Sequence, residues 1–152
     1  MAKFQPIGDT PFTEIKQLGM VVRDIDKTVE YYTSLGIGPF KPLAMNITEK
    51  WVRGKRVELK GRALVVKLGP VELELIQPLE GPSIFFEFLK KRGEGLHHLG
   101  FPVENLDGEE ERLVKQGLKV LQKGRGPNCG YTHFETDAIG GVVLEILKTL
   151  PE

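Results

Sequence analysis

The stretch Gln17-Leu18-Gly19-Met20-Val21-Val22-Arg23-Asp24-Ile25-Asp26 decides the expected fold, because a version of it returns later in the chain. Shifted by 81 positions, it falls on His98-Leu99-Gly100-Phe101-Pro102-Val103-Glu104-Asn105-Leu106-Asp107. The match continues without a gap to Gly36-Ile37 on Gly117-Leu118, and 6 of the 21 aligned positions are identical. An internal repeat of this kind predicts two copies of one structural unit.

A second match supports the repeat. Gly69-Pro70-Val71-Glu72-Leu73-Glu74-Leu75-Ile76 falls on Gly140-Gly141-Val142-Val143-Leu144-Glu145-Ile146-Leu147 at an offset of 71. The change of offset from 81 to 71 means that the first copy carries 10 extra residues between the two matches. We assign this excess to the basic stretch around residues 46–61.

Each copy is predicted to begin with a strand and to continue with a helix and further strands. Alternating apolar residues open the first copy, with Leu18, Met20 and Val22 on one face. Asp26 and its counterpart Asp107 are expected to cap the helices that follow. Gly36 and Gly117 are expected to end them in a left-handed conformation. Between the copies, residues 82–92 read as a linker helix whose Phe85, Phe86, Phe88 and Leu89 belong to the core.

Composition excludes several classes of protein. The chain has 152 residues, and its 21 Lys and Arg balance its 21 Asp and Glu, so nothing draws it to nucleic acid or to an anionic membrane. The single cysteine, Cys129, excludes an intrachain disulfide and a thiolate zinc cluster. Residues 1–6 contain no apolar run of the kind found in signal peptides, and no later run approaches a membrane span, so we expect a cytoplasmic location.

The repeat pairs four polar residues that carry chemistry. Gln17 and His98 are equivalent positions, on the strand face opposite the apolar residues, and so are Glu74 and Glu145. Pseudo-twofold symmetry would bring one amide, one imidazole and two carboxylates together. This donor set suits a hard or borderline divalent ion, Zn²⁺, Co²⁺, Ni²⁺, Mn²⁺ or Mg²⁺.

The neighbours of Glu145 favour burial. Val143 and Leu147 share its strand face, and a buried carboxylate is costly unless it is paired, hydrogen-bonded or bound to a metal. The alternative is that Gln17 and His98 are satisfied core polar groups and Glu74 is a surface residue. Equivalence of all four positions favours the metal site.

These residues resemble a known family. The patterns Ile15–Ile25, Gly95-Leu96-His97-His98-Leu99 and Gly140-Gly141-Val142-Val143-Leu144-Glu145 are similar to those of the vicinal oxygen chelate superfamily, which includes glyoxalase I, methylmalonyl-CoA epimerase, extradiol dioxygenases and bleomycin-resistance proteins. The resemblance covers about residues 13–150. The segment Leu75–Leu79, with Phe88–His98, is most similar to methylmalonyl-CoA epimerases.

The resemblance implies a fold and an organisation. It implies an α+β fold in which two βαβββ modules form an open, mixed, barrel-like sheet with flanking helices. The whole chain, 1–152, would be a single domain, with module one at about 13–80, the linker helix at about 82–92 and module two at about 95–150. Members of the superfamily often pair modules across a dimer, so we expect a homodimer by analogy.

The resemblance also implies a reaction. Its metal ligands fall on Gln17, Glu74, His98 and Glu145, and the combination is similar to the zinc set of animal-type glyoxalase I; epimerases usually have histidine where Gln17 stands. Similarity to glyoxalase I makes Glu145 the mobile base as well as a ligand. The expected chemistry is proton abstraction next to a carbonyl through a metal-stabilised enediolate. The substrate would be an acyl-CoA thioester or a glutathione hemithioacetal.

Several residues are left outside this site. We interpret His97 as structural and facing away from His98, His133 as a loop or strand residue, and Cys129 as no nucleophile. An epimerase needs a second acid/base group, for which the sequence offers Lys67 without a fixed direction. The basic run Lys50–Arg56, with Lys60 and Arg62, is interpreted as solvated turns, or as contacts to the phosphates of an anionic substrate.

Two other functions stay open. One is a metal-free protein that sequesters a small molecule, as bleomycin-resistance proteins do; Gln17 and the missing second base favour it. The other is a ring-cleaving dioxygenase, which is weaker because those enzymes usually present a histidine at the position of Gln17.

Overall fold

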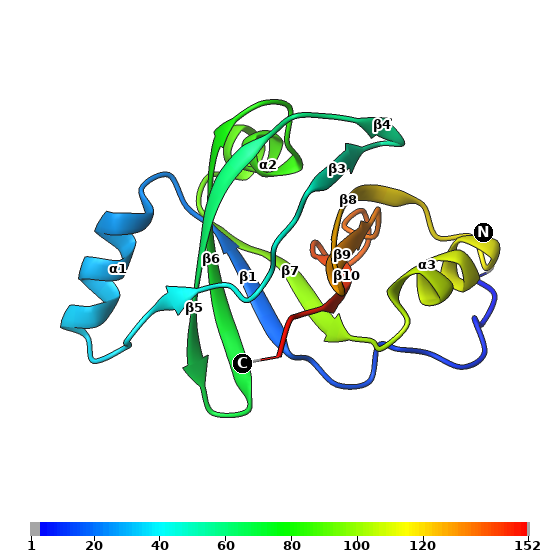
Figure 1. Cartoon of the computed structure of the whole chain (residues 1–152), viewed down its shortest axis with the longest axis horizontal. Helices are drawn as coiled ribbons and strands as arrows, with labels where there is room; N and C mark the ends of the chain where they lie inside the picture. The colour runs from blue at the N-terminus through cyan, green and yellow to red at the C-terminus, as the bar shows by residue number, and fades with distance from the viewer. Residues whose placement is uncertain (1–3, 152) are drawn as a thin grey trace.

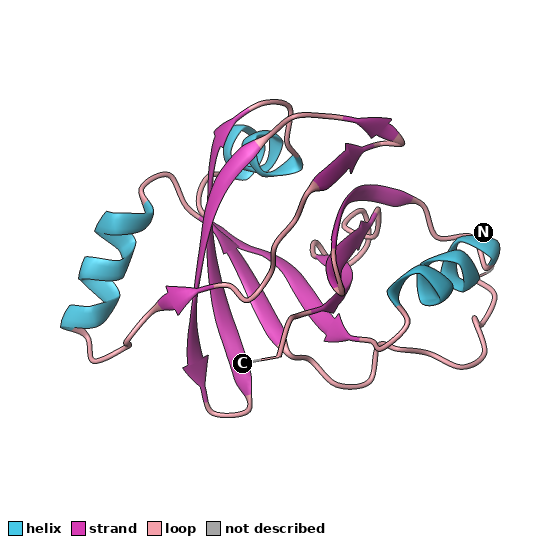
Figure 2. Ribbon diagram, viewed as in Figure 1, coloured by secondary structure: helices cyan, strands magenta, loops and turns pink. Residues whose placement is uncertain are grey.

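In the computed structural model, residues 4–151 are described, and they form one curled mixed sheet with helices around it (Figures 1 and 2). The helices are α1 (Ile25–Ser34), α2 (Ile84–Arg92) and α3 (Leu106–Lys115). The strands are β1 (Gln17–Val21), β2 (Lys41–Pro42), β3 (Glu49–Val52), β4 (Lys55–Arg56), β5 (Lys60–Leu68), β6 (Val71–Glu80), β7 (Gly95–Pro102), β8 (Val120–Gly126), β9 (Cys129–Phe134) and β10 (Val143–Lys148). None of the three helices in residues 4–151 is long and apolar enough to cross a membrane.

The order of the strands carries the internal repeat. It runs β2-β5-β6-β1-β7-β10-β9-β8-β3-β4, so the opening strands of the two copies, β1 and β7, lie side by side at the centre. They are antiparallel to each other, and each is parallel to the closing strand of its own copy, β6 or β10. The predicted α+β fold with an open, barrel-like mixed sheet is confirmed.

The two equivalent helices pack against opposite ends of the sheet, and their N-caps differ from the prediction (Figure 1). Asp24 caps α1 by accepting from the backbone N–H of Lys27, and Asn105 caps α3 in the same way. The prediction of Asp26 and Asp107 as caps is wrong by two residues. Both carboxylates instead bind arginines on neighbouring strands, Arg62 and Arg125. The prediction that Gly36 and Gly117 follow the helices with positive φ is confirmed.

The extra residues of the first copy leave their own half of the sheet. They form the β3–β4 hairpin, whose turn uses Arg53 and Gly54 at positive φ. β3 then pairs with β8 of the second copy, with Trp51 opposite Lys123. The basic run is therefore partly a strand hairpin, and it extends the sheet of the other module.

Apolar side chains fill the space between the sheet and each helix. Leu18, Met20 and Leu75 pack with α1, while Phe134 and Ile146 pack with α3. Phe85, Phe88 and Leu89 of α2 form a third cluster with strands from both copies, as predicted, but Phe86 is exposed. The α1 and α3 clusters take up the outer side chains of the strands. The inner face carries the polar residues together with Val21, Ile76 and Val143, which pack against α2.

Candidate functional site

The inner face of the sheet gathers all four residues that the repeat singles out. Gln17, Glu74, His98 and Glu145 are each at most 4% exposed. The alternative in which Glu74 is a surface residue is therefore wrong. Three of the four, Gln17, Glu74 and Glu145, line one cavity of about 390 Å³.

Two equivalent glycines make room for this group. Gly19 lies between Glu74 and His98 in the sheet register, and Gly100 lies between Gln17 and Glu145. A Cβ on Gly19 would stand 2.0 Å from the His98 ring, and one on Gly100 would stand 2.7 Å from Oε1 of Glu145. The glycine that follows leucine in both copies is thus required by the side chains on the neighbouring strands.

His98 lies between the two carboxylates. Its Nε2 is 3.2 Å from Oε1 of Glu74 and 3.7 Å from Oε1 of Glu145. Oε1 of Glu145 is buried and has no hydrogen-bond partner among the described residues. A buried carboxylate oxygen without a donor is costly, so these three atoms together have the chemistry of a cation site.

Gln17 is held by a further carboxylate. Its Nε2 donates to Oε1 of Glu72 at 3.2 Å, and Glu72 is also buried. The bond leaves Oε1 of Gln17 as the atom that can accept from or ligate another group. The sequence comparison did not single out Glu72, because its counterpart in the second copy is Val143.

His133 is the main residue that sequence reasoning missed. It lies on β9 directly opposite Glu145 of β10, and its Nε2 is 2.5 Å from Oε2 of Glu145. Its Nδ1 is buried and has no partner among residues 4–151. The alternation of Tyr131 and His133 in the strand preceding the Glu145 strand was the available signal, because adjacent strands of a hairpin share their faces.

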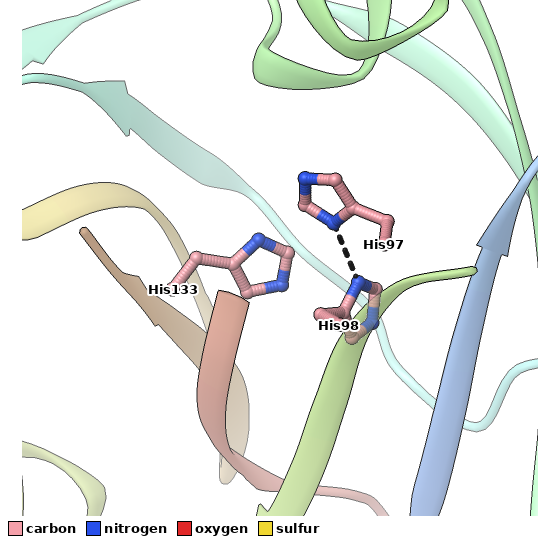
Figure 3. A group of neighbouring side chains, drawn as sticks. All are labelled: His97, His98 and His133. Carbon is pink, nitrogen blue, oxygen red and sulfur yellow. Dashed lines mark hydrogen bonds between the residues drawn. The ribbon is translucent and has the colours of Figure 1, made fainter. Parts of the chain in front are cut away.

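His97 also differs from the prediction. The pairing of β1 with β7 skips from Gly19–His98 to Met20–Leu96, which leaves His97 as the extra residue of a β-bulge. A bulge re-aims side chains, and here Nδ1 of His97 comes to 2.9 Å from Nδ1 of His98 (Figure 3). The prediction that His97 faces away from His98 is wrong.

The three imidazoles form a buried cluster of their own. His97, His98 and His133 each offer one nitrogen, and these nitrogens lie within 4.8 Å of one another. Figure 3 shows the three rings converging from β7 and β9. Imidazole nitrogens beside two carboxylates suit borderline ions such as Zn²⁺, Co²⁺ and Ni²⁺.

Burial sets the protonation of the group. Burial raises the pKa of Glu145 to about 8. The neighbouring His98 lowers this pKa, and the neighbouring Glu74 raises it. Burial lowers the pKa of His133 to about 4, and the pKa of His97 falls to about 2 through burial and the neighbouring histidines. Near neutral pH the metal-free site therefore holds neutral His97 and His133 rings and a Glu145 that binds its proton unusually tightly.

Basic residues line the same cavity as the proposed site. Its wall includes Phe85, Tyr131 and His133, and Lys50, Lys60 and Arg62 lie along it. Arg62 makes two hydrogen bonds to Asp26. Ion pairs this exposed contribute little, so the Arg62 guanidinium can exchange its partner for an anionic ligand.

Lys67 does not serve this cavity. It pairs in register with Glu72 and lines a different cavity at the other end of β5 and β6. Cys129 is buried, and its thiol lies against the backbone of Asn46, in agreement with the prediction that it is no nucleophile.

Sequence comparison places the chain in a family. A sequence model of the Glyoxalase/Bleomycin resistance protein/Dioxygenase superfamily matches residues 16–133. An uncharacterised protein of Bacillus subtilis (strain 168), YqjC, is 35% identical over 66 residues. That match covers 43% of this chain and 47% of YqjC, about half the length of the curated relative.

Structural comparison finds the same fold in several solved proteins. A methylmalonyl-CoA epimerase from Mycobacterium tuberculosis is 24% identical, with a TM-score of 0.63 and coverage of 91% of this chain and 89% of that one. A methylmalonyl-CoA epimerase in complex with methylmalonyl-CoA and NH4+ is 25% identical, with a TM-score of 0.64 and coverage of 90% and 94%. A hypothetical protein of Bacillus halodurans C-125, BH1468, is 19% identical, with a TM-score of 0.67 and coverage of 91% and 96%. With the repeated module and the sequence match over residues 16–133, the chain belongs to the glyoxalase, bleomycin resistance protein and dioxygenase superfamily.

Proposed function

We propose that this protein is a metal-dependent isomerase or lyase that moves a proton next to a carbonyl group. The observation that carries the proposal is the Glu145 carboxyl group. One oxygen is hydrogen-bonded to His133, and the other is buried beside His98 and has no hydrogen-bond partner within residues 4–151. A carboxylate held in this way can bind a cation through one oxygen while the other exchanges a proton.

The residues present fit a divalent cation. Oε1 of Glu74 and Oε1 of Glu145 lie 3.2 Å and 3.7 Å from Nε2 of His98, and the amide oxygen of Gln17, whose Nε2 is held by Glu72, is a further possible ligand. When bound there, a divalent cation would supply Lewis acidity that stabilises negative charge on the carbonyl oxygen of the substrate. We propose Gln17, Glu74, His98 and Glu145 as its ligands.

Glu145 is the proposed base. A pKa raised by burial makes a carboxylate a stronger base, which is what abstraction of a proton next to a carbonyl requires. His133 contacts Oε2 at 2.5 Å and keeps this oxygen oriented while it gains or loses the proton. Phe85 adds an apolar ring to the wall of the cavity that Glu145 lines.

The cavity and the comparisons support a proposal for the substrate class. A methylmalonyl-CoA epimerase of known structure, 25% identical to this chain, holds methylmalonyl-CoA. We propose an acyl-CoA thioester for this protein as well, with Lys50, Lys60 and Arg62 along the cavity meeting its negative charge. A glutathione hemithioacetal is the second candidate, because a lyase of that type can work with Glu145 as its single base.

Epimerisation needs a proton donor on the second face of the substrate. Tyr131 lines the cavity beside His133, with its hydroxyl oxygen accepting from Nε2 of Gln122 at 3.2 Å. Since that oxygen already accepts a hydrogen bond, its own proton can be directed to a ligand. Tyr131 is the proposed second acid, in place of Lys67.

The test begins with metal. Protein purified without chelator is analysed for bound ions, then stripped and titrated with Ni²⁺, Co²⁺ and Zn²⁺. We expect about one ion per chain and, for Glu145→Gln, much weaker binding. Glu80→Gln is the control, because Glu80 lies on the same strand as Glu74 but is exposed and pairs with Lys60.

The loaded protein is then incubated in D₂O with acyl-CoA thioesters and with hemithioacetals, and exchange of the α-proton is followed by NMR. Exchange of the thioester proton alone supports the epimerase, and conversion of the hemithioacetal supports the lyase. Absence of tight metal binding would overturn both in favour of a protein that sequesters a small molecule. Gel filtration tests the homodimer that the family resemblance suggests, and cell fractionation tests the cytoplasmic location expected from the sequence.

A further inference from the structure

His97 lies behind the proposed ligand His98 and takes no part in the proposed reaction. It comes from the β-bulge in β7, is 5% exposed, and packs edge-on against the rings of Phe85 and Phe88. Its one short polar contact is the Nδ1–Nδ1 distance of 2.9 Å to His98. An apolar side chain would pack equally well at this position, so packing does not explain why the residue is a histidine.

The contact between two Nδ1 atoms requires one proton. If both nitrogens carried a proton they would repel, and if neither did there would be no hydrogen bond. One ring therefore donates and the other accepts. In neutral imidazole only one nitrogen carries the proton, so the choice also fixes the state of both Nε2 atoms.

Without metal, the contact with Glu74 determines which of the two rings donates. Nε2 of His98 is 3.2 Å from Oε1 of Glu74, and a carboxylate oxygen in this contact is the acceptor, so Nε2 of His98 carries the proton. Nδ1 of His98 is then an acceptor. The proton between the two rings consequently belongs to His97, whose own Nε2 is left without one.

A cation at Glu74 and Glu145 reverses the choice. Nε2 of His98 must then present its lone pair and give up its proton, and Nδ1 of His98 takes over the proton that His97 had donated between the two rings. His98 now donates to His97, which accepts at Nδ1 and carries its proton on Nε2. The proton count is unchanged: water takes one proton from Nε2 of His98, and Nε2 of His97 takes one from water.

The surroundings of His97 allow this exchange. Figure 3 shows that Nε2 of His97 points away from His98. His97 also lines a separate cavity of about 230 Å³, with Arg53, Glu87 and Asp137 on its wall, whereas it does not line the cavity of the proposed reaction site. A backbone carbonyl or a carboxylate at this place could only accept, so it would serve the metal-bound state alone.

We propose that His97 is a positioning residue that reverses its hydrogen bond to His98 when a cation binds. The inference rests on the proposed metal site and goes beyond it, because it assigns a role to a residue that is not a proposed ligand. Because imidazole is neutral as an acceptor, His97 also leaves the proposed cation a stronger Lewis acid than a carboxylate partner would.

The experiment is ¹⁵N NMR of the histidine rings, which reports which ring nitrogen carries the proton. The chain has only 3 histidines, so assignment by single variants is direct. Metal-free protein is expected to show His98 protonated on Nε2 and His97 on Nδ1. With Zn²⁺ bound, both are expected to be inverted. An unchanged His97 on loading, or a direct bond from Zn²⁺ to His97, would overturn the inference and leave the metal site standing.

Affinity supplies a second readout. His97→Leu should weaken Zn²⁺ binding by about 10- to 100-fold, as loss of such a partner typically does. His97→Asn, whose amide can turn to donate or accept, should recover part of the loss. Phe88→Leu is the control for packing, because it changes the other side of the His97 ring and no hydrogen bond. Wild-type affinity in His97→Leu would overturn the role. Failure of the wild type to bind Zn²⁺ would overturn the metal site and this inference together.

Discussion

The two copies of the module place different residues at equivalent positions of the same sheet face. In the second copy, β9 brings His133 opposite Glu145, whereas in the first copy β5 brings Val65 opposite Glu74. Two residues earlier on the closing strands the difference is reversed. The first copy has the polar Glu72 where the second copy has the apolar Val143. The two halves are thus similar in backbone and unlike in proton chemistry.

Because of this difference, we assign different roles in the proposed reaction to the two copies. In the first copy, the carboxylate of Glu72 accepts a hydrogen bond from Gln17 and fixes the orientation of its amide. This amide does not ionise near neutral pH. In the second copy, the imidazole of His133 contacts Glu145, whose pKa is raised. We infer that the first half orients ligands and the second half moves the proton.

The largest expected effect tests this division directly. Glu145→Gln removes the base and should lower the rate of α-proton exchange by about 10³- to 10⁴-fold. Glu74→Gln removes only a proposed ligand from the first copy, so it should weaken metal binding and retain more of the rate at saturating metal. Exchange measured by NMR at several Zn²⁺ concentrations separates the two. Equal losses at saturating metal would contradict the assignment of the base to the second copy.

The pH dependence of stability sharpens the same contrast in metal-free protein. Because burial raises the pKa of Glu145 to about 8, the native state keeps its proton where the unfolded chain, with a pKa of 4.5, has lost it. Stability should therefore fall as the pH rises from about 5 to 8, by roughly 2–4 kcal/mol. Denaturant titrations of wild type and Glu145→Gln should show this slope in the wild type alone.

His133 acts in the opposite direction. Its pKa is lowered from 6.5 to about 4, so the unfolded chain binds the proton first and stability should fall as the pH drops from 6.5 toward 4. His133→Val, which copies the first module, should remove this acidic loss. A variant that keeps the full loss below pH 6.5 would contradict the burial of a neutral His133.

The equivalent glycines give a contrast of intermediate size. A Cβ on Gly19 meets the His98 ring at 2.0 Å, and that ring is also held by His97, so Gly19→Ala should cost about 3 kcal/mol of stability. A Cβ on Gly100 meets Oε1 of Glu145 at 2.7 Å, at the movable end of a side chain. Gly100→Ala should thus cost about 1 kcal/mol but weaken metal binding. Thermal unfolding and Zn²⁺ titration of both variants check this, and a greater loss of stability in Gly100→Ala would refute it.

Much of this arrangement could be predicted from the sequence, because it follows from strand alternation and from the repeat. Gln17, Glu74, His98 and Glu145 share one face because side chains alternate along strands, and equivalence of the copies brings the four together. The α+β fold follows from the same two facts. The helix ends at Gly36 and Gly117 could also be predicted, since a left-handed residue is a local requirement.

The features that were missed depend on which segments pair. His97 turns toward His98 only because β7 forms a bulge against β1, and no local pattern specifies a bulge. The β3–β4 hairpin belongs to the first copy in sequence but pairs with β8 of the second. The true N-cap, Asp24, lies two residues before Asp26, and both are acceptable caps; Asp26 is drawn away by Arg62 on β5.

The smallest expected effect concerns the ion pairs that join the helix of each module to its sheet. Asp26 and Arg62 of the first copy are exposed, so Asp26→Asn should leave the melting temperature unchanged within roughly 1 °C. In the second copy, Arg125 and Thr132 both bind Glu110, whose side chain is only 14% exposed.

Glu110→Gln should therefore lower the melting temperature by roughly 4 °C, because it leaves a partly buried guanidinium with a weaker acceptor. Scanning calorimetry at low and high salt distinguishes the two, because salt screens the exposed Asp26–Arg62 pair and has little effect on the partly buried network of Glu110. The change in melting temperature of Glu110→Gln should therefore depend little on salt. A larger effect at Asp26 than at Glu110 would mean that the first module, and not the second, depends on its charges for stability. The covered network of Glu110, Arg125 and Thr132 would then contribute less to stability than the exposed pair of the first copy.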